Sequence, residues 1–489
     1  MKKIIFITAI LFSFTYAQAQ DAVYKQLRYD WTVNADGTSD YHYRHEVKIL
    51  RNRALTAYAD KGETFVTYNP DIEDLTINEV YTIRENGSRV DMPQNAFIYQ
   101  LPSQCADCGR FNHIRELAMI HTGMEYNCVI VVDYTIHRRY NLLNITLPLV
   151  KECPIEHLEV NISMPNDMNL DVQLNNPGLF PFNPTVNQTA NSYSLKASNI
   201  AQNYNEAYMP EYNRVYPTLH FYNGTPEFTP AFDQNGLPEA KDAAYAQIQG
   251  NNDIDDIAAV RNFVIDNIHL NELPAAMLGY THATAAEVWR SGCGTATDKA
   301  VLLAAMLNQL KYNAHVTGEN MDEVGVVIDT NEYRLNVRKK TPITIYGEAK
   351  DEVTVVNDSR KHTSYRLDTL EGGFYRLTLE PIKKSPKMNP ANLTPSRTAP
   401  LASPLCDINV SDEYTLPKGM KMVGSTVNED LTYNGIGSVK ISIKQKGKKL
   451  IVERTLKLEK SLITTADYAN FRRLIATWQS NDKVLLRNK

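Results

Sequence analysis

The sequence predicts a multidomain α+β protein that contains more strand than helix. Its 489 residues are enough for about three domains of ordinary size. Apolar and polar residues alternate with period two through most of the first half, which is typical of half-buried strands. A central region has helical periodicity instead, and strand patterns return after it. We therefore expect an N-terminal antiparallel β-sandwich, a mixed α+β core, and a small C-terminal β domain with a terminal helix.

Residues 1–19 have the three parts of a secretory signal peptide. Two lysines open the segment, residues 4–14 form an apolar stretch, and Ala17 and Ala19 give a small-residue cleavage signature. The apolar stretch is shorter than the roughly 20 residues that a membrane-spanning helix needs. No Cys follows it to carry a lipid anchor. We expect a cleaved signal and a periplasmic or secreted protein that is not transmembrane.

Residues 21–230 are predicted to form the N-terminal β-sandwich. Segments such as YKQLRYDWTV and HYRHEVKIL alternate in polarity, and turn-forming residues separate them. Asn86-Gly87, between VYTIRE and SRVDMP, predicts a tight hairpin. Many short strands divided by turns are typical of an antiparallel sandwich. His42 and His45 should lie on opposite faces of their strand, which argues against a shared metal.

Residues 235–383 are predicted to form the α+β core. The segments DIDDIAAVRNFVIDNI and DKAVLLAAMLNQL combine good helix formers with apolar residues at helical spacing. The acidic start of the first segment favours a helix N-terminus over a calcium loop, because the Gly and distal Glu of an EF-hand are absent. The segments VGVVID, EYRLNV and EVTVVND return to strand.

The C-terminal part begins with a Pro- and Ser-rich segment, residues 384–404, which predicts a linker. Residues 405–489 are predicted to form the small β domain, with a hairpin at QKGKK. The segment 464–480 is an expected amphipathic helix, since four large apolar side chains share one face: Tyr468, Phe471, Leu474 and Trp478.

Charge and motifs exclude several functions. The formal net charge is −5, so the basic surplus that drives nucleic-acid binding is absent. The sequence has no Walker loop, no dinucleotide-binding glycine pattern, no His-Glu-x-x-His and no Gly-x-Ser-x-Gly. We therefore expect no cofactor, no metal and no nucleic-acid partner.

The six cysteines are too few for a disulfide scaffold in a chain of this length. Cys105 and Cys108 form a CxxC in a loop, and the simplest interpretation in an exported protein is a local disulfide. Zinc would need two more ligands, and the nearby histidines lack a standard zinc spacing. Cys128 and Cys153 could pair across strands, but connectivity does not follow from sequence.

Cys293 lies in the segment RSGCGTATDKA, directly before a predicted helix. The positive end of a helix dipole stabilises a thiolate, and a nearby His would complete a Cys–His pair. A Cys at such a position is also common as a small buried apolar residue.

Residues 286–307, AEVWRSGCGTATDKAVLLAAML, resemble the nucleophile motif of the transglutaminase-like superfamily. The Ala-Glu-Val, Arg290 and Asp298-Lys299-Ala300 match that motif. The segments TIRENGSRVDMP and TTADYANFRRLIATWQS are also similar to secreted bacterial members, which have a β-sandwich domain of unknown function before the core. The resemblance covers most of the mature chain. It implies a transglutaminase-like (papain-like) core that descends from a Cys–His–Asp enzyme.

The motif departs from the family at the catalytic positions. Aligned on Asp298, the family's nucleophile falls on Ala296, which has no nucleophilic atom. Cys293 lies three residues upstream, about 4.5 Å along the axis if that segment were helical. A misplacement of about 1 Å can cost on the order of 100-fold in rate. The segment 330–337, where the family's His is expected, has none, and His362 lies in a polar stretch that predicts a loop.

Two functions follow from these residues. The first is a non-catalytic transglutaminase-like protein that acts in binding or assembly in the cell envelope, with an extended peptide or an envelope protein as partner. The second is a cysteine-dependent peptidase, amidase or acyltransferase that uses Cys293 with His362 and Asp368. We expect the first, because two of the three catalytic positions fail. The ligand, the pathway and the oligomeric state stay open.

Overall fold

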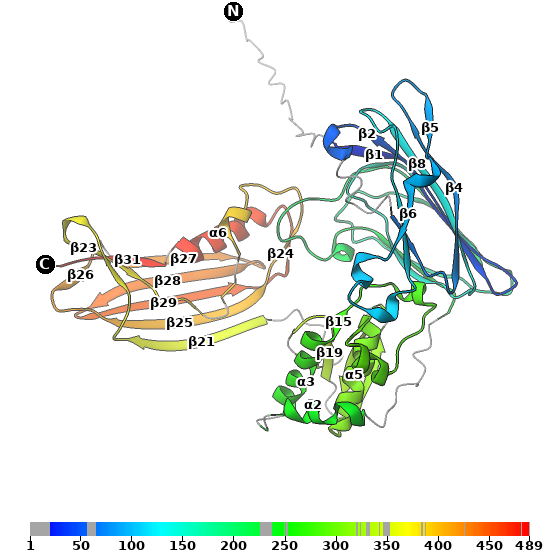
Figure 1. The fold of residues 1–489 in the computed structure, drawn as a ribbon. Helices are drawn as coiled ribbons and strands as arrows, with labels where there is room; N and C mark the ends of the chain where they lie inside the picture. Colours follow the sequence, from blue (N-terminus) through cyan, green and yellow to red (C-terminus); the bar gives the residue numbers. More distant parts are fainter. Residues whose placement is uncertain are drawn as a thin grey trace, which may run out of the picture. The chain divides into compact units, whose positions relative to one another are not determined.

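The computed structural model divides into two compact units, shown in Figure 1. The first consists of Met1–Asn175, Pro181–Asn203 and Pro217–Tyr346, and the second of Asn176–Phe180, Tyr204–Tyr216 and Gly347–Lys489. The predicted signal peptide, residues 1–19, lies outside the described residues. These are 20–55, 65–224, 237–248, 250, 253–318, 321–322, 324–328, 333–341, 343–345, 353–382, 385–386, 388–424, 426–480 and 482–488.

An eight-stranded sheet is the largest element of the first unit. Strands β1 (Ala22–Val33) and β10 (Ile155–Ser163) pair in parallel, and the other neighbouring strands pair antiparallel. Leu27, Tyr29 and Trp31 of β1 are buried, as the period-two pattern predicts. In sheet order the strands are β12 (Thr185–Gln188), β13 (Ser192–Ile200), β10 (Ile155–Ser163), β1 (Ala22–Val33), β2 (Ser39–Ile49), β8 (Val129–Arg138), β4 (Glu73–Ile83) and β5 (Arg89–Asp91).

Two three-stranded sheets complete the β part of this unit. Trp31 packs on Phe221 of one of them, with 4.8 Å between ring centroids, so this sheet covers the apolar face of the large one. The predicted hairpin at Asn86-Gly87 is confirmed between β4 and β5, where Gly87 has a φ of 83°. The sheets are β11 (Asp171–Asn175)–β14 (Thr218–Tyr222)–β9 (Asn144–Pro148) and β3 (Phe65–Tyr68)–β7 (Arg115–Met119)–β6 (Phe97–Gln100).

The helical part of the first unit is built around α5 (Ala296–Gln309). Every residue from Ala296 to Leu307 is buried, because the helix packs against other helices and against β17 and β18. The other helices are α2 (Lys241–Ala246), α3 (Asp253–Asn267) and α4 (Ala285–Ser291). The strands are β15 (His269–Leu270), β16 (Cys293–Gly294), β17 (Ala314–Gly318), β18 (Val324–Ile328), β19 (Tyr333–Asn336) and β20 (Thr344–Ile345).

Among its described residues, the second unit contains a five-stranded sheet, a four-stranded sheet and one α-helix, α6 (Tyr468–Ser480). The predicted apolar face of α6 is buried at Tyr468, Phe471 and Leu474. The first sheet is β21 (Val353–His362), β25 (Leu405–Thr415), β29 (Lys449–Leu458), β28 (Gly437–Lys446) and β27 (Val427–Tyr433). The second is β22 (Leu367–Thr369), β23 (Phe374–Thr378), β31 (Lys483–Asn488) and β26 (Met420–Met422). Strands β24 (Leu401–Ala402) and β30 (Leu462–Ile463) form a separate two-stranded antiparallel sheet.

The structure divides the chain differently from the sequence-based expectation of a core over residues 235–383. β21 pairs in parallel with β25, and β23 pairs with β31, so the segment 353–378 belongs to the second unit. The expected linker 384–404 is partly packed, since Met388, Leu393 and Leu401 are buried in the core of that unit. α6 is not the terminal element, because β31 follows it.

No helix among the described residues is long and apolar enough to cross a membrane.

His42 and His45 lie on opposite faces of β2, as predicted. His45 is fully buried and lies 2.9 Å from the Tyr43 hydroxyl, whereas His42 belongs to the polar face. His121 is buried in the same unit, and its burial, together with the charge of His45, lowers its pKa to about 4.

Replacing Phe471 by Ala should lower the free energy of unfolding of the second unit by about 3–5 kcal/mol, because a fully buried aromatic ring is lost from its core. Urea denaturation followed by circular dichroism measures the change. Arg473→Ala, at an exposed position of the same helix, is the control and should change the value by less than about 0.5 kcal/mol. Equal effects of the two variants would contradict the packing of α6.

The protein should lose stability as the pH falls from 6.5 to about 4, the pKa values of His121 in the unfolded and folded states. Within this window the unfolded chain binds a proton at His121 that the folded chain does not. This group alone should contribute up to about 3 kcal/mol of that loss. Urea denaturation at several pH values in this window gives the free energy of unfolding as a function of pH. This function should have a smaller slope for His121→Asn than for the parent. A slope that is unchanged in the variant would refute the assignment.

Candidate functional site

The N-terminus of α5 is the candidate site, because the resemblance places a catalytic nucleophile there. Thr295 caps the helix with its hydroxyl, which accepts a hydrogen bond from the Asp298 N–H, and the Asp298 carboxylate accepts one from the Thr295 N–H. The helix begins at Ala296, which is buried. A methyl group therefore lies where the helix dipole could have stabilised a thiolate.

Asp298 of the Asp-Lys-Ala motif is a fully buried carboxylate with three donors. Its oxygens accept hydrogen bonds from the Ala283 N–H at 2.6 Å, the Thr295 N–H at 2.9 Å and the Arg110 guanidinium at 2.8 Å. Arg110 comes from the β part of the chain, 188 residues earlier. A buried carboxylate needs such compensation, so the motif Asp joins the helical part to the β part.

Lys299 of the same motif is also buried. Its ammonium donates to the Ile268 carbonyl at 2.8 Å and to the Ile265 carbonyl at 3.2 Å, at the C-terminal end of α3. Burial lowers the pKa of Lys299 to about 8. A cation at the C-terminus of a helix satisfies its last carbonyls, so Lys299 fixes α3 against α5.

Cys293, on β16, forms a disulfide with Cys108, with 5.9 Å between the Cα atoms. The prediction of a Cys105–Cys108 disulfide is therefore wrong, and Cys105 is a buried free thiol. The reason is tertiary: the loop that holds Cys108 packs on the helical part, in an apolar cluster with Leu273. Sequence spacing carries no information about this packing. The Cys128–Cys153 pair that the sequence left open does not form a disulfide.

His362 ends strand β21, whereas the sequence predicted a loop. Its Nε2 lies 2.8 Å from Asp412 Oδ1, and its ring stacks on Tyr414 with 4.5 Å between centroids. Asp412 is fully buried and accepts further hydrogen bonds from Arg360 and Arg454. His362 is thus part of a charged cluster inside the second unit.

Asp368, the third residue of the catalytic alternative, lies on β22 in the second unit. Its carboxylate accepts hydrogen bonds from Arg366 and Arg376, which lower its pKa. Each candidate residue therefore has its own partner: a sulfur for Cys293, Asp412 for His362 and two guanidinium groups for Asp368.

A small cavity lies beside the start of α5, lined by Asn271, Thr295, Ala296, Asp322 and Arg338 among others. Its accessible volume is about 10 Å³, which is the space of roughly one water molecule. Asp322 accepts a hydrogen bond from the Ala275 N–H at 2.8 Å, and burial raises its pKa. No histidine lines this cavity among the described residues, and a peptide side chain does not fit into it.

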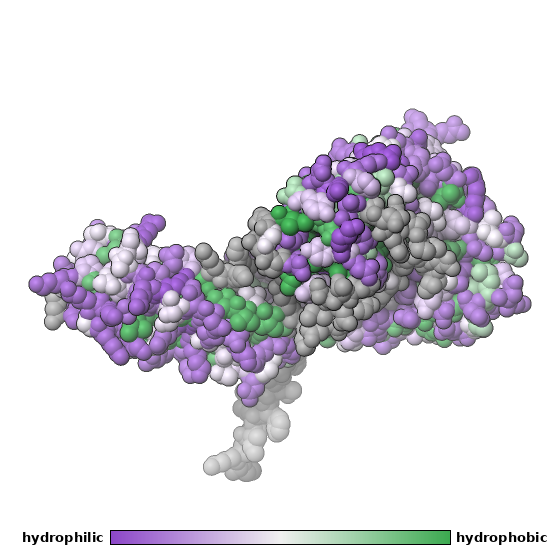
Figure 2. All heavy atoms as spheres, turned by 90° about the horizontal axis from the view of Figure 1, so that it is seen from below, coloured by the Kyte–Doolittle hydropathy of each residue, from purple (hydrophilic) through white to green (hydrophobic). Residues whose placement is uncertain are grey.

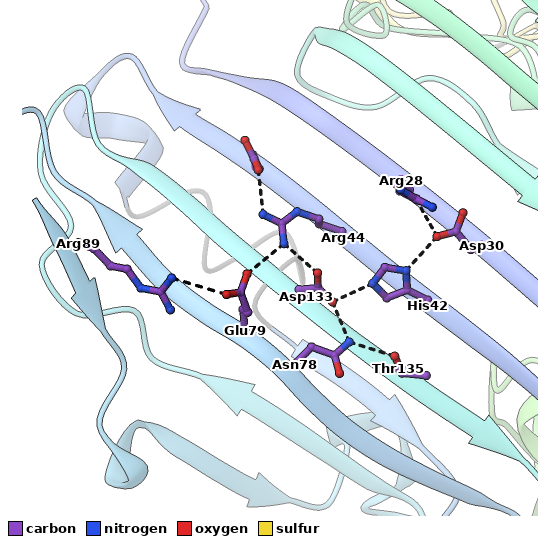
Figure 3. Close-up of polar contacts among 10 residues, drawn as sticks. Arg28, Asp30, His42, Arg44, Asn78, Glu79, Arg89, Asp133 and Thr135 are labelled. Carbon is purple, nitrogen blue, oxygen red and sulfur yellow. Dashed lines mark hydrogen bonds and ion pairs between the residues drawn. The ribbon is translucent and has the colours of Figure 1, made fainter. Parts of the chain in front are cut away.

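The polar face of the eight-stranded sheet has a charged network, drawn in Figure 3. His42 on β2 connects two carboxylates, with Nδ1 at 2.9 Å from Asp30 and Nε2 at 2.8 Å from Asp133. Arg44 donates to Asp133 at 2.8 Å and to Glu79 at 3.2 Å. The network therefore links strands β1, β2, β8 and β4.

Asp133 lies at the centre of this network. Burial opposes ionisation of its carboxyl, but hydrogen bonds from Asn78, Arg44 and His42 hold its pKa below the usual value. This network is not predicted from the sequence, since its only signal is charge of alternating sign on neighbouring strands. Nowhere in the described part of the chain do three His, Cys, Asp or Glu side chains form a group that could hold a metal ion. The cations and carboxylates of this face satisfy one another.

Arg110→Ala should lower the free energy of unfolding of the first unit by about 2–4 kcal/mol, because it leaves the buried Asp298 carboxylate without its cation. Urea denaturation measures the effect. Arg290→Ala removes an exposed ion pair with Glu239 close by and is the matched control, with an expected change below about 0.5 kcal/mol. A loss no larger than that of the control would contradict the role given to Arg110.

Two family models match separate parts of the chain. The domain of unknown function DUF3857 matches residues 35–203, and the domain of unknown function DUF3858 matches residues 375–486. The first match falls on the β part of the first unit, except for Asn176–Phe180, which belong to the second unit. The second match lies in the second unit. It begins within β23 and ends within β31, and it includes most of each of these two strands. No functionally curated protein matches the chain.

Among solved structures, the chain is similar to a Parabacteroides distasonis protein that carries the name "putative protease". The two are 24% identical with a TM-score of 0.74, and the match covers 96% of this chain and 99% of the other. An M1 zinc metallopeptidase from Deinococcus radiodurans matches with 8% identity and a TM-score of 0.19, over 59% of this chain and 64% of that one, which supports no argument. Two segments of the chain are thus similar to the DUF3857 and DUF3858 families, and the chain has a fold that the Parabacteroides protein shares.

Proposed function

We propose that this chain is an exported, transglutaminase-like protein that binds an extended polypeptide and does not cleave it. The disulfide of Cys293 with Cys108 is the observation that most supports this function. A thiolate is the nucleophile in cysteine-dependent catalysis, and a sulfur in a disulfide is not one. Export rests on the signal-peptide pattern of residues 1–19.

The rest of the motif has a structural use. Ala296 begins α5 without a reactive atom, Asp298 binds Arg110, and Lys299 binds the end of α3. The adjacent cavity has the volume of about one water molecule, too small for a substrate side chain. In this proposal the motif residues stabilise the fold of a transglutaminase-like core but provide no catalytic nucleophile.

Strand β6 is the binding surface that we assign to the polypeptide. It is the edge of the sheet β3–β7–β6, and within the described residues it pairs only with β7. Ile98 is 42% exposed and Tyr99 60% exposed, on opposite faces of the strand, and Ile120 at the end of β7 is 53% exposed. Exposed apolar edge strands invite pairing with another extended chain.

Surface hydropathy fits this assignment. On the face drawn in Figure 2 most side chains are hydrophilic, and hydrophobic residues gather in a few separate patches. β6 exposes an apolar side chain on each of its faces, Ile98 and Tyr99, and exposed apolar patches commonly mark binding sites.

The second candidate function is a cysteine-dependent peptidase, amidase or acyltransferase that uses Cys293 with His362 and Asp368. The observation in its favour is the fold shared with the Parabacteroides protein that carries the name "putative protease". It requires reduction of the Cys108–Cys293 disulfide and release of His362 from Asp412.

The mature chain should bind fluorescein-labelled casein, an unfolded polypeptide, and leave it intact. Fluorescence anisotropy reports binding, and gel electrophoresis reports cleavage. Casein cleavage that iodoacetamide abolishes would establish the cysteine enzyme and refute the proposal. Absence of casein binding would refute the binding function as well.

Ile98→Lys should weaken casein binding about 10-fold or more, because it places a charge on the apolar edge of β6 and removes the apolar surface that the peptide would cover. Val186→Lys is the matched control, since Val186 is 40% exposed on the edge strand β12 of the large sheet. Equal weakening by the two variants would show that β6 is not the binding edge.

A further inference from the structure

Three cysteines lie together where the β part meets the helical part of the first unit. Cys105, Cys108 and Cys293 are all buried in one apolar cluster, with Phe111 and Ile114. Cys108 and Cys293 form the disulfide, and Cys105 is a free thiol. A free thiol inside a cluster that contains a disulfide is a potential partner for exchange.

A tight turn holds Cys105 next to Cys108. The Cys108 N–H donates a hydrogen bond of 3.1 Å to the Cys105 carbonyl, which closes a four-residue turn. Such turns keep their end Cα atoms within about 7 Å, and disulfides usually join Cα atoms about 4.4–6.8 Å apart. The Cα atoms of Cys108 and Cys293 are 5.9 Å apart. Cys108 is therefore near enough to bond with either neighbour.

We infer that this cluster is a thiol–disulfide exchange site in which Cys105 displaces Cys293 from Cys108. The Cys105 thiolate attacks the sulfur of Cys108, the Cys105–Cys108 bond forms, and the Cys108–Cys293 bond breaks. Cys293 leaves as a thiolate and takes up a proton equivalent to the one that Cys105 lost. One disulfide and one thiol are present before and after the step, so no external oxidant or reductant is needed.

The step changes how the first unit is held together. The original disulfide joins residues 185 positions apart, across the boundary between the β part and the helical part. The exchanged disulfide closes only a local turn. The ion pair of Arg110 with Asp298 and the hydrogen bond from Asn271 to the Gln104 carbonyl would then hold the loop on the helical part without a covalent bond.

Burial makes the exchange dependent on pH. It raises the pKa of the Cys105 thiol, with a smaller effect of Glu116 in the same direction, so little thiolate is present at neutral pH. Only the thiolate attacks a disulfide. The exchange rate should therefore rise about tenfold per pH unit while the thiol remains mostly protonated.

Peptide mapping tests the inference directly, because trypsin separates the two connectivities. Cleavage after Arg89 and Arg110 releases a peptide with both Cys105 and Cys108, and cleavage after Arg290 and Lys299 releases one with Cys293. The mature chain is held at about pH 7 and about pH 9, on either side of the usual thiol pKa of about 8.5, then denatured in acid with N-ethylmaleimide. We expect labelled Cys293 and the internal Cys105–Cys108 bond to increase together, faster at the higher pH.

The Cys105→Ser variant should show only the cross-linked peptides at both pH values, and Cys153→Ser, which removes a cysteine outside the cluster, should behave as the parent. Circular dichroism confirms that each variant is folded. Two results would overturn the inference: a parent chain that stays fully cross-linked at both pH values, or labelled Cys293 in the Cys105→Ser variant.

Discussion

The first unit depends on how the buried Asp298 carboxylate is neutralised. This side chain is fully buried at the start of α5, the helix around which the helical part packs. Its cation, Arg110, comes from the β part. Because an uncompensated buried charge is costly, the helical part is complete only when the β part is folded beside it. The Cys108–Cys293 disulfide and the Asn271 hydrogen bond to the Gln104 carbonyl reinforce the same junction.

Asp298 and Lys299 have structural roles at this junction. Asp298 and Lys299 satisfy buried backbone and charged groups on three different segments, so their loss would leave those groups unpaired. No such constraint acts on the position of Ala296, whose side chain only has to fit into a packed interior. Position 296 and positions 298–299 are therefore under different physical requirements.

Local sequence patterns predicted several helices and strands of this chain well. They did not predict which strands pair with each other or which cysteines form the disulfide. The Asn86-Gly87 hairpin, the helix that begins at Ala296 and the apolar face of α6 all follow from residues close in sequence. The assignment of β21 to the core was wrong because its partner, β25, comes more than forty residues later and pairs in parallel. Cys108 was paired with its neighbour Cys105 for the same reason, since only tertiary packing brings Cys293 to it. The network around His42 has no local signal in the sequence, because its charged side chains lie on different strands.

Strand β31 has a consequence for the order of assembly. It comes after α6 in the chain, yet it lies between β23 and β26 and pairs with both. In the four-stranded sheet β22–β23–β31–β26, strands β23 and β26 are connected only through β31. During synthesis from the N-terminus, the second unit therefore remains an incomplete sheet until residues 483–488 have emerged. Its unpaired strand edges would be exposed to aggregation during that interval, which gives a chaperone a defined period in which to act.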